Sequence, residues 1–242
     1  MLLRVNELTK KFGEVPAVNG VSFGVEAGEI FALIGPNGSG KTTMVKTIAG
    51  LLRQNAGSIL VNGHDTLNDP LNAKQSVGYI PDDPTIWSGM TGEEFLHFVG
   101  TLYGMGEQVR MRRIREVLPL FSLEGLEKGL FEDYSRGNKQ KFSILAGLMH
   151  EPKLLLIDEP IVGLDPASTE IAKRAFVRFA EGGGAIMLVT HTLSVAEEIA
   201  SRIGVLREGV LVATGSLAEL RARKNLPADS SLHEIYKHYT GT

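Results

Sequence analysis

Three short runs along the chain are almost entirely apolar. They cover residues 30–34, 154–157 and 185–189. Continuous apolar runs of this length are typical of strands that are buried on both faces, as in parallel sheets. Each run ends in residues able to do chemistry: a glycine-rich loop, then Asp158 and Glu159, then Thr190 and His191. Because ligands bind at the carboxyl ends of strands in an open parallel sheet, the pattern predicts that the three ends meet at one site.

Apolar residues at helical spacing fill the intervals between these runs, so strands and helices alternate. Residues 91–149 show apolar residues at helical spacing with no strand pattern between them, which predicts an inserted helical lobe. Half-buried strands are expected over about the first 25 residues and at 58–61, and a hairpin at 205–212 that turns at residues 208–209. The prediction is an α/β fold: a mainly parallel sheet, a flanking antiparallel β layer and the helical lobe.

The last part of the chain predicts a linker followed by one helix. Residues 221–229 are charged and contain a proline, which favours a linker. Apolar positions at helical spacing then define a short amphipathic helix: Leu232, Ile235, Tyr236 and Tyr239. We therefore divide the chain into a domain of residues 1–220 and a tail of residues 221–242. The helix either docks on its own domain, which is the more common arrangement, or makes a dimer or regulatory contact.

Composition narrows the class of protein and of partner. The length of 242 residues is ample for a large core, and 43% hydrophobic with 22% charged residues is typical of a globular protein. A net charge of −3 offers no broad basic surface, so no nucleic-acid partner is expected. The absence of cysteine suits a reducing compartment. With no secretory signal and no apolar run near the roughly 20 residues of a membrane span, we expect a cytoplasmic protein whose membrane role comes through a partner.

The glycine-rich loop matches the phosphate-binding pattern G-x-x-x-x-G-K-S/T between a strand and a helix (GPNGSGKT, residues 35–42). Its glycines let backbone N–H groups face phosphates, Lys41 reaches the β and γ oxygens, and Thr42 offers a hydroxyl to Mg²⁺. The predicted ATP-binding residues are Gly35, Pro36, Asn37, Gly38, Ser39, Gly40, Lys41, Thr42 and Thr43. The motif predicts a P-loop NTPase core, which kinases, GTPases, motors and transporters share.

Two adjacent carboxylates follow the second apolar run directly. Asp158 is expected to hold Mg²⁺, directly or through water, and Glu159 to orient and polarise the water that attacks the γ-phosphate. His191, at the end of the third run, is expected to donate a hydrogen bond to the γ-phosphate. The predicted catalytic residues are therefore Glu159 and His191, and the cofactors are ATP and Mg²⁺.

With these motifs in order, the chain resembles the nucleotide-binding subunits of ATP-binding cassette (ABC) transporters along nearly its whole length. The segment YSRGNKQK, residues 134–141, is similar to the family's signature sequence and precedes the acidic strand. The resemblance implies that Ser135 and the Gly137 amide bind the γ-phosphate held by a second subunit, so that each ATP lies between two chains. It also implies that Phe12 stacks on adenine, that Gly163, Leu164 and Asp165 communicate between the two sites, and that His191 is the switch histidine.

Two positions depart from the family's pattern. Asp82 stands where the family usually has glutamine. A carboxylate about 4 Å from a phosphate charge costs roughly 1 kcal/mol at high dielectric and about 4 kcal/mol near a protein surface, so Asp82 must contact Mg²⁺ closely or retract. Arg136 replaces a small glycine of the signature, and Asn138 its glutamine. The sequence leaves open whether Arg136 contacts phosphate or points to solvent. The predicted metal ligands are Thr42, Asp158 and Asp82.

The leading hypothesis is an ATPase subunit that pairs with a second nucleotide-binding subunit, identical or not, and drives a separate membrane permease through its helical lobe. The order serine, basic residue, glycine resembles export-type cassettes, which favours export and a peripheral place on the inner face of the cell membrane. A cassette ATPase without a permease, acting in translation, on DNA or in assembly, is the alternative. A small-molecule kinase or GTPase is not supported, because no N-K-x-D guanine motif is present.

Overall fold

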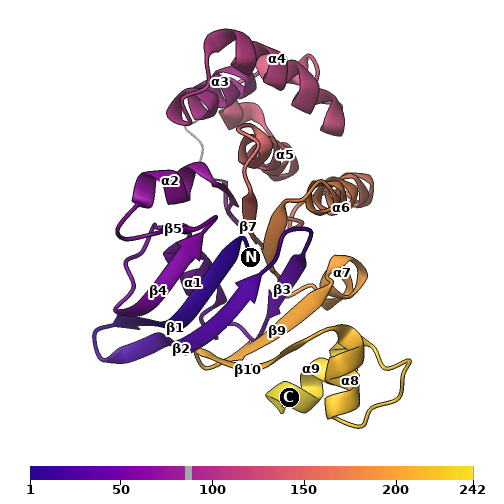
Figure 1. Ribbon diagram of the computed structural model, residues 1–242. Helices are drawn as coiled ribbons and strands as arrows, with labels where there is room; N and C mark the ends of the chain where they lie inside the picture. The colour runs from indigo at the N-terminus through magenta and orange to yellow at the C-terminus, as the bar shows by residue number, and fades with distance from the viewer. Residues whose placement is uncertain (85–88, 242) are drawn as a thin grey trace.

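The computed structural model describes residues 1–84 and 89–241. Two β sheets form the body of the molecule, a helical lobe stands at the top of the view in Figure 1, and two C-terminal helices lie at the bottom right. This arrangement confirms the predicted α/β class with its parallel sheet, antiparallel layer and helical lobe.

The larger sheet has six strands in the order β10-β9-β3-β8-β7-β6, and every neighbouring pair is parallel except β10 with β9. The strands are β3 (Ile30–Ile34), β6 (Val77–Ile80), β7 (Leu154–Asp158), β8 (Ala185–Val189), β9 (Arg202–Arg207) and β10 (Val210–Gly215). Every residue of β3, β7 and β8 is buried. The continuous apolar runs therefore mark strands covered on both faces, as predicted.

The predicted hairpin is confirmed, with its turn between Arg207 and Val210. Its first strand, β9, pairs parallel with β3 and so extends the large sheet. Four consecutive residues of β9 are buried, which is the pattern of an interior strand. Since β9 follows a helix that crosses from β8, the chain returns in the parallel direction.

The smaller sheet is antiparallel, with the order β2-β1-β4-β5. Its strands are β1 (Leu3–Phe12), β2 (Val15–Val25), β4 (Ala56–Val61) and β5 (His64–Asp65). Helix α1 (Lys41–Ile48) lies between the two sheets, where Met44, Val45 and Ile48 share one buried cluster with Leu3 and Phe31. The helix that begins at the glycine-rich loop is thus held from both sides.

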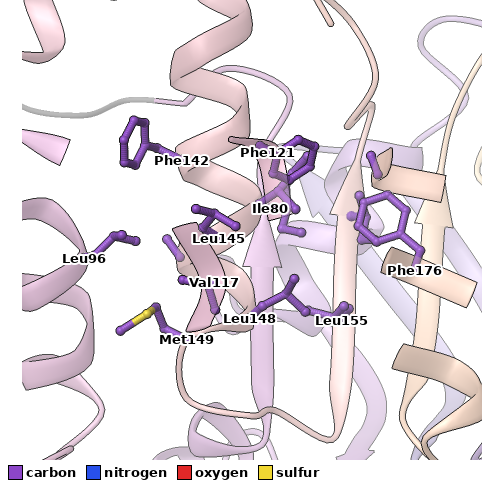
Figure 2. Close-up of a cluster of buried hydrophobic side chains, with 14 of the residues drawn as sticks. Ile80, Leu96, Val117, Phe121, Phe142, Leu145, Leu148, Met149, Leu155 and Phe176 are labelled. Atoms are coloured by element: carbon purple, nitrogen blue, oxygen red, sulfur yellow. The ribbon is translucent and has the colours of Figure 1, made fainter. Parts of the chain in front are cut away.

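The helical lobe shares its core with the large sheet. Its elements, and the short helix before them, are α2 (Pro70–Gln75), α3 (Gly92–Leu102), α4 (Glu107–Val117) and α5 (Arg136–Leu148), with 3-10 turns at Leu118–Phe121, Leu126–Lys128 and Phe131–Asp133. Figure 2 shows Leu145 and Leu148 of α5 among Leu96 of the lobe and Ile80 and Leu155 of the sheet, all in one cluster. Helix α5 is therefore the joint between lobe and sheet.

The remaining helices are α6 (Pro166–Glu181), α7 (Leu193–Ile199), α8 (Leu217–Arg223) and α9 (Leu232–Thr240). The predicted linker is wrong at its start, because residues 221–223 complete α8, whose Ser216 and Glu219 form a capping box. Leu232 and Ile235 of α9 are fully buried with Ile34 of β3. The last helix therefore docks on its own chain, while the division at residue 220 stays a prediction. None of the helices in residues 1–84 and 89–241 is long and apolar enough to cross a membrane.

Candidate functional site

The loop between β3 and α1 requires glycine at two tightly packed positions. Gly40 has φ of 103°, and a Cβ there would lie 2.1 Å from the Ala17 carbonyl oxygen. A Cβ on Gly35 would lie 2.2 Å from the Leu206 carbonyl oxygen. Both distances are far inside van der Waals contact with backbone atoms, so no other residue fits without moving β2 or β9.

The N-terminus of α1 is open. Its N-cap residue is Gly40, no side chain caps it, and its first turn has no acidic residue. The first backbone N–H groups of a helix lack intrahelical acceptors and carry a partial positive charge. This end of α1 is therefore suited to bind an anion.

Lys41 is folded back onto the loop. Its Nζ donates hydrogen bonds to the carbonyl oxygens of Gly35 at 2.8 Å and Pro36 at 3.0 Å, and the residue is 7% exposed. Burial lowers the pKa of the Lys41 ammonium, while the nearby carboxylates of Glu159 and Asp158 oppose that change. The loop therefore holds a buried ammonium group close to two carboxylates.

Thr42 and Asp158 meet across the site, although β8 lies between β3 and β7 in the sheet. The Thr42 hydroxyl donates to Asp158 Oδ1 at 3.4 Å, and Asp158, the last residue of β7, is 2% exposed. Burial raises the pKa of the Asp158 carboxyl, and the hydrogen bond from Thr42 opposes that rise. The Thr42 hydroxyl oxygen and an Asp158 carboxylate oxygen, both predicted metal ligands, thus lie close together.

These oxygens fit Mg²⁺ on chemical grounds. Mg²⁺ prefers oxygen ligands and is usually bound by one or two carboxylates together with substrate phosphates and waters. Within the described part of the chain no group of three acidic or histidine side chains forms a metal cage. Thr42 and Asp158 therefore suit a cation that enters with a nucleotide.

Glu159 reaches across to the end of β8. Its carboxylate accepts hydrogen bonds from the Thr190 hydroxyl at 3.1 Å and the His191 backbone N–H at 2.8 Å. The imidazole Nδ1 of His191 lies 2.8 Å from the same Oε1. The structure thus brings together the two predicted catalytic residues, and adds Thr190, which the sequence placed at the strand end without a role.

A cavity of about 430 Å³ opens in front of these groups. It is lined by Ala17, Asn37, Gly38, Gly40, Lys41, Thr42, Thr43, Asp82, Arg136, Glu159, Val162 and His191. Most of the lining comes from residues predicted from the sequence. Ala17 and Val162 were missed, because each is an ordinary apolar residue whose place here depends only on the folded chain.

Six predicted binding residues lie outside this lining: the loop residues Gly35, Pro36 and Ser39, together with Phe12, Ser135 and Gly137. Phe12, at the end of β1, is 54% exposed, and the Lys10 ammonium lies 5.1 Å from its ring centroid. Ser135 and Gly137 belong to the turn that starts α5 and do not line the cavity of their own chain. Their predicted roles, like that of Phe12, require a bound nucleotide and stay predictions.

The turn before α5 is built from close contacts. Ser135 is the N-cap residue, and its hydroxyl oxygen accepts a hydrogen bond from the Asn138 N–H at 3.2 Å. A Cβ on Gly137 would lie 2.8 Å from the Gly163 carbonyl oxygen. The signature turn therefore packs against the loop after β7.

Asp165, in that same loop, caps α6. Its carboxylate accepts a hydrogen bond from the Ser168 N–H at 2.8 Å and lies 3.6 Å from the Lys141 ammonium of α5. Hydrogen bonds from Ser168, followed by the charge of Lys141, lower the pKa of Asp165 to about 2. The carboxylate therefore stays ionised and ties the start of α6 to α5.

The two departures from the family pattern face each other. An Arg136 guanidinium nitrogen lies 3.6 Å from Asp82 Oδ1, and both side chains are about half exposed. Arg136 therefore does not point to solvent alone, because it pairs with Asp82 and lines the cavity, and its contact with a phosphate stays a prediction. The two positions are 54 residues apart in the sequence, and β6 and α5 place them side by side.

The parallel sheet, the glycine loop at the start of α1 and the acidic end of β7 together define a P-loop nucleoside triphosphatase. A family model described as ABC transporter matches residues 18–162. The chain belongs to this family, and it is an ATP-binding, ATP-hydrolysing subunit of an ABC transporter.

Known proteins agree with this assignment. The chain is 34% identical over 222 residues to the linearmycin resistance ATP-binding protein LnrL of Bacillus subtilis (strain 168), covering 92% of this chain and 71% of LnrL. A solved structure of the ATP-binding subunit of an ABC transporter superposes with a TM-score of 0.94 at 33% identity, covering 99% of both chains. A bacterial ABC transporter cassette solved as a dimer superposes with a TM-score of 0.82 at 25% identity, covering 89% of this chain and 98% of the cassette.

Proposed function

We propose that this chain powers an export permease in the cell membrane, by closing with a second cassette around ATP and reopening after hydrolysis. The observation that carries the proposal is the exposed Ser135, which, unlike its neighbour Arg136, does not line the ATP cavity of its own chain. We infer that the turn contacts ATP held by a second subunit. The dimeric bacterial cassette supports the pairing, and the resistance function in the name of LnrL supports export.

In this proposal, different groups of the cavity bind the phosphates, hold the metal ion and activate the water. The N–H groups at the start of α1 and the Lys41 ammonium bind the phosphates, and Thr42 with Asp158 holds Mg²⁺. Mg²⁺, when bound, neutralises charge on the β and γ oxygens. Glu159 orients and polarises the attacking water, and His191 donates to the γ-phosphate.

Asp82 is a weaker candidate for the metal than Thr42 and Asp158. Its carboxylate is paired with Arg136, whereas the other two oxygens lie within 3.4 Å of each other. We therefore propose Thr42 and Asp158 as the protein ligands, with Asp82 at the edge of the site, where pairing with Arg136 offsets its repulsion of phosphate.

The permease contact is proposed at a groove between the lobe and the sheet. The groove holds about 360 Å³ and is mostly apolar, with aromatic and aliphatic side chains of α3 along one side. Leu51 and Leu102, at its rim, are 59% and 68% exposed. Large exposed apolar side chains around a groove favour an amphipathic helix of a partner protein. Such a contact would place this chain on the cytoplasmic face of the membrane.

The hydrolytic part of the proposal is tested by Glu159→Gln. We expect ATP turnover to fall by about 100-fold or more while ATP affinity stays within about twofold, because only the polarisation of water is lost. We also expect ATP to convert the variant from monomer to a stable dimer in sedimentation velocity. A variant that keeps its turnover would remove Glu159 from the mechanism, and one that stays monomeric with ATP would remove the closing dimer.

The permease contact is tested by Leu102→Glu. We expect the tagged variant to lose co-purification with a multi-span membrane protein from detergent-solubilised membranes, while its own ATPase rate is unchanged. Leu71→Glu is the matched control, because Leu71 is 75% exposed on α2 and does not line the groove. Equal recovery of the membrane protein with both variants would place the contact elsewhere.

A further inference from the structure

The carboxylate of Glu159 is held by donors from two consecutive residues at the end of β8. Oε2 accepts from the Thr190 hydroxyl at 3.1 Å, and Oε1 accepts from the His191 N–H at 2.8 Å. The Glu159 side chain is only 13% exposed. These donors therefore replace much of the water that would otherwise solvate its charge.

The backbone brings this carboxylate to β8. Glu159 has φ of 51°, and its N–H donates to the Val189 carbonyl oxygen at 2.9 Å, continuing the pairing of β7 with β8. A left-handed conformation is uncommon for a residue other than glycine, and it persists where the surroundings determine it. The end of β8 supplies those surroundings.

The direction of the Thr190 hydrogen bond follows from its second contact. The Thr192 N–H donates to Thr190 Oγ1 at 3.0 Å, and a backbone N–H cannot accept. The hydroxyl therefore accepts from Thr192 and has its single proton available for Glu159. An ionised carboxylate only accepts, so the two groups match.

Thr190 and His191 differ in their freedom to move. Thr190 is 2% exposed, whereas the His191 side chain is 60% exposed. An exposed imidazole can rotate away from Glu159 without displacing neighbouring atoms. A buried hydroxyl with both an acceptor and a donor contact cannot.

We propose that Thr190 is a positioning residue for ATP hydrolysis: its hydroxyl anchors Oε2 of Glu159, so that the carboxylate keeps its place when the His191 imidazole turns toward a bound phosphate. The inference rests on the proposed role of Glu159. A purely structural role, in which the Thr190 hydroxyl only closes the turn to Thr192, is the competing explanation.

The experiment compares Thr190→Val, which keeps the shape and removes the hydroxyl, with Thr190→Ser, which keeps the hydroxyl. Each is made in the wild-type chain and in the Glu159→Gln chain. Single-turnover ATP hydrolysis, equilibrium binding of ATP and thermal unfolding are measured for all. Thr240→Val is the matched control, because Thr240 is buried in α9 and its hydroxyl donates to the Tyr236 carbonyl oxygen, far from the site in sequence.

In the wild-type chain we expect Thr190→Val to slow hydrolysis about ten- to hundredfold, because a hydrogen bond to a charged group is lost, with ATP affinity within about twofold. Thr190→Ser should retain at least about half of the rate, and Thr240→Val all of it. In the Glu159→Gln chain, Thr190→Val should cause no further loss. If the Thr190 hydroxyl only closed the turn to Thr192, Thr190→Val would slow hydrolysis by the same factor in both chains.

Two results would overturn the inference. One is an unchanged rate in Thr190→Val, and the other is an equal fractional loss in both backgrounds. If Thr190→Val unfolds, the serine variant still decides, since a rate as low as that of Glu159→Gln despite the retained hydroxyl contradicts anchoring. A fully active Glu159→Gln chain would instead refute the proposed role of Glu159, which is a distinguishable failure.

Discussion

The N-termini of α1 and α5 both lie near the site, and they differ in how the unpaired N–H groups of their first turns are satisfied. Helix α1 begins at Gly40 without a side-chain cap, inside the cavity, whereas α5 begins at the exposed Ser135, which caps it. Unpaired N–H groups at a helix start need acceptors. The start of α1 therefore has no side-chain acceptor from its own chain, whereas the first turn of α5 has one, the Ser135 hydroxyl oxygen.

The capped start of α5 still has a hydrogen-bond donor for a second subunit. The Ser135 oxygen accepts from Asn138, so the hydroxyl proton is not used in that contact. Ser135 can therefore stabilise its own helix and donate to a phosphate at once. The proposed function therefore predicts that a single chain binds ATP and that the signature turn contributes only after pairing.

The largest effect is expected at the start of α1, on ATP binding. Lys41→Ala should weaken ATP binding by about 100-fold or more, because a charge-assisted contact to the phosphates is lost from a site with little water. Equilibrium binding with a fluorescent ATP analogue measures it. Near-normal binding would mean that the N–H groups of the loop suffice on their own.

A smaller effect of a different kind is expected on the α5 side. Ser135→Ala should leave ATP binding by the single chain within about twofold and lower hydrolysis about tenfold or more, since only the paired state uses the turn. Loss of the cap should also lower the free energy of unfolding by about 1 kcal/mol. A fall in monomer ATP affinity equal to that of Lys41→Ala would erase the distinction between the two helix starts.

The smallest effect is expected from the pair next to the signature turn. A double-mutant cycle of Asp82→Gln and Arg136→Gly should give a coupling of roughly 0.2–1 kcal/mol in the free energy of unfolding, because both side chains are half exposed. Urea unfolding at low and high salt measures it, and the coupling should shrink with salt. A larger, salt-insensitive coupling would show that the pair rigidly locks the lobe to the sheet.

Local chemistry explains what could be predicted. The glycine loop, the carboxylates after β7 and the histidine after β8 sit at the ends of runs whose burial is visible in the residues themselves. The turn of the hairpin was equally local. The sheet that the hairpin joins was not local, because β9 belongs to the large sheet through its partner β3, and the paired residues Val205 and Ile34 are 171 positions apart in the sequence.

The linker prediction failed for a related reason. Charge and proline in residues 221–229 are typical of a linker, yet α8 extends to Arg223, whose guanidinium donates to the Thr214 carbonyl oxygen of β10. Arginine is a good helix former, and its contact with the sheet edge is invisible in the sequence.

The sequence by itself determined the phosphate loop, the acidic strand end and the family, because each depends on residues that are neighbours along the chain. Only the tertiary structure decided that Asp82 pairs with Arg136, that Thr190 anchors Glu159, and that Ser135 lies outside its own cavity. These contacts join elements whose distance in the sequence says nothing of their distance in space. Strand order and the packing of α5 against the sheet bring them together.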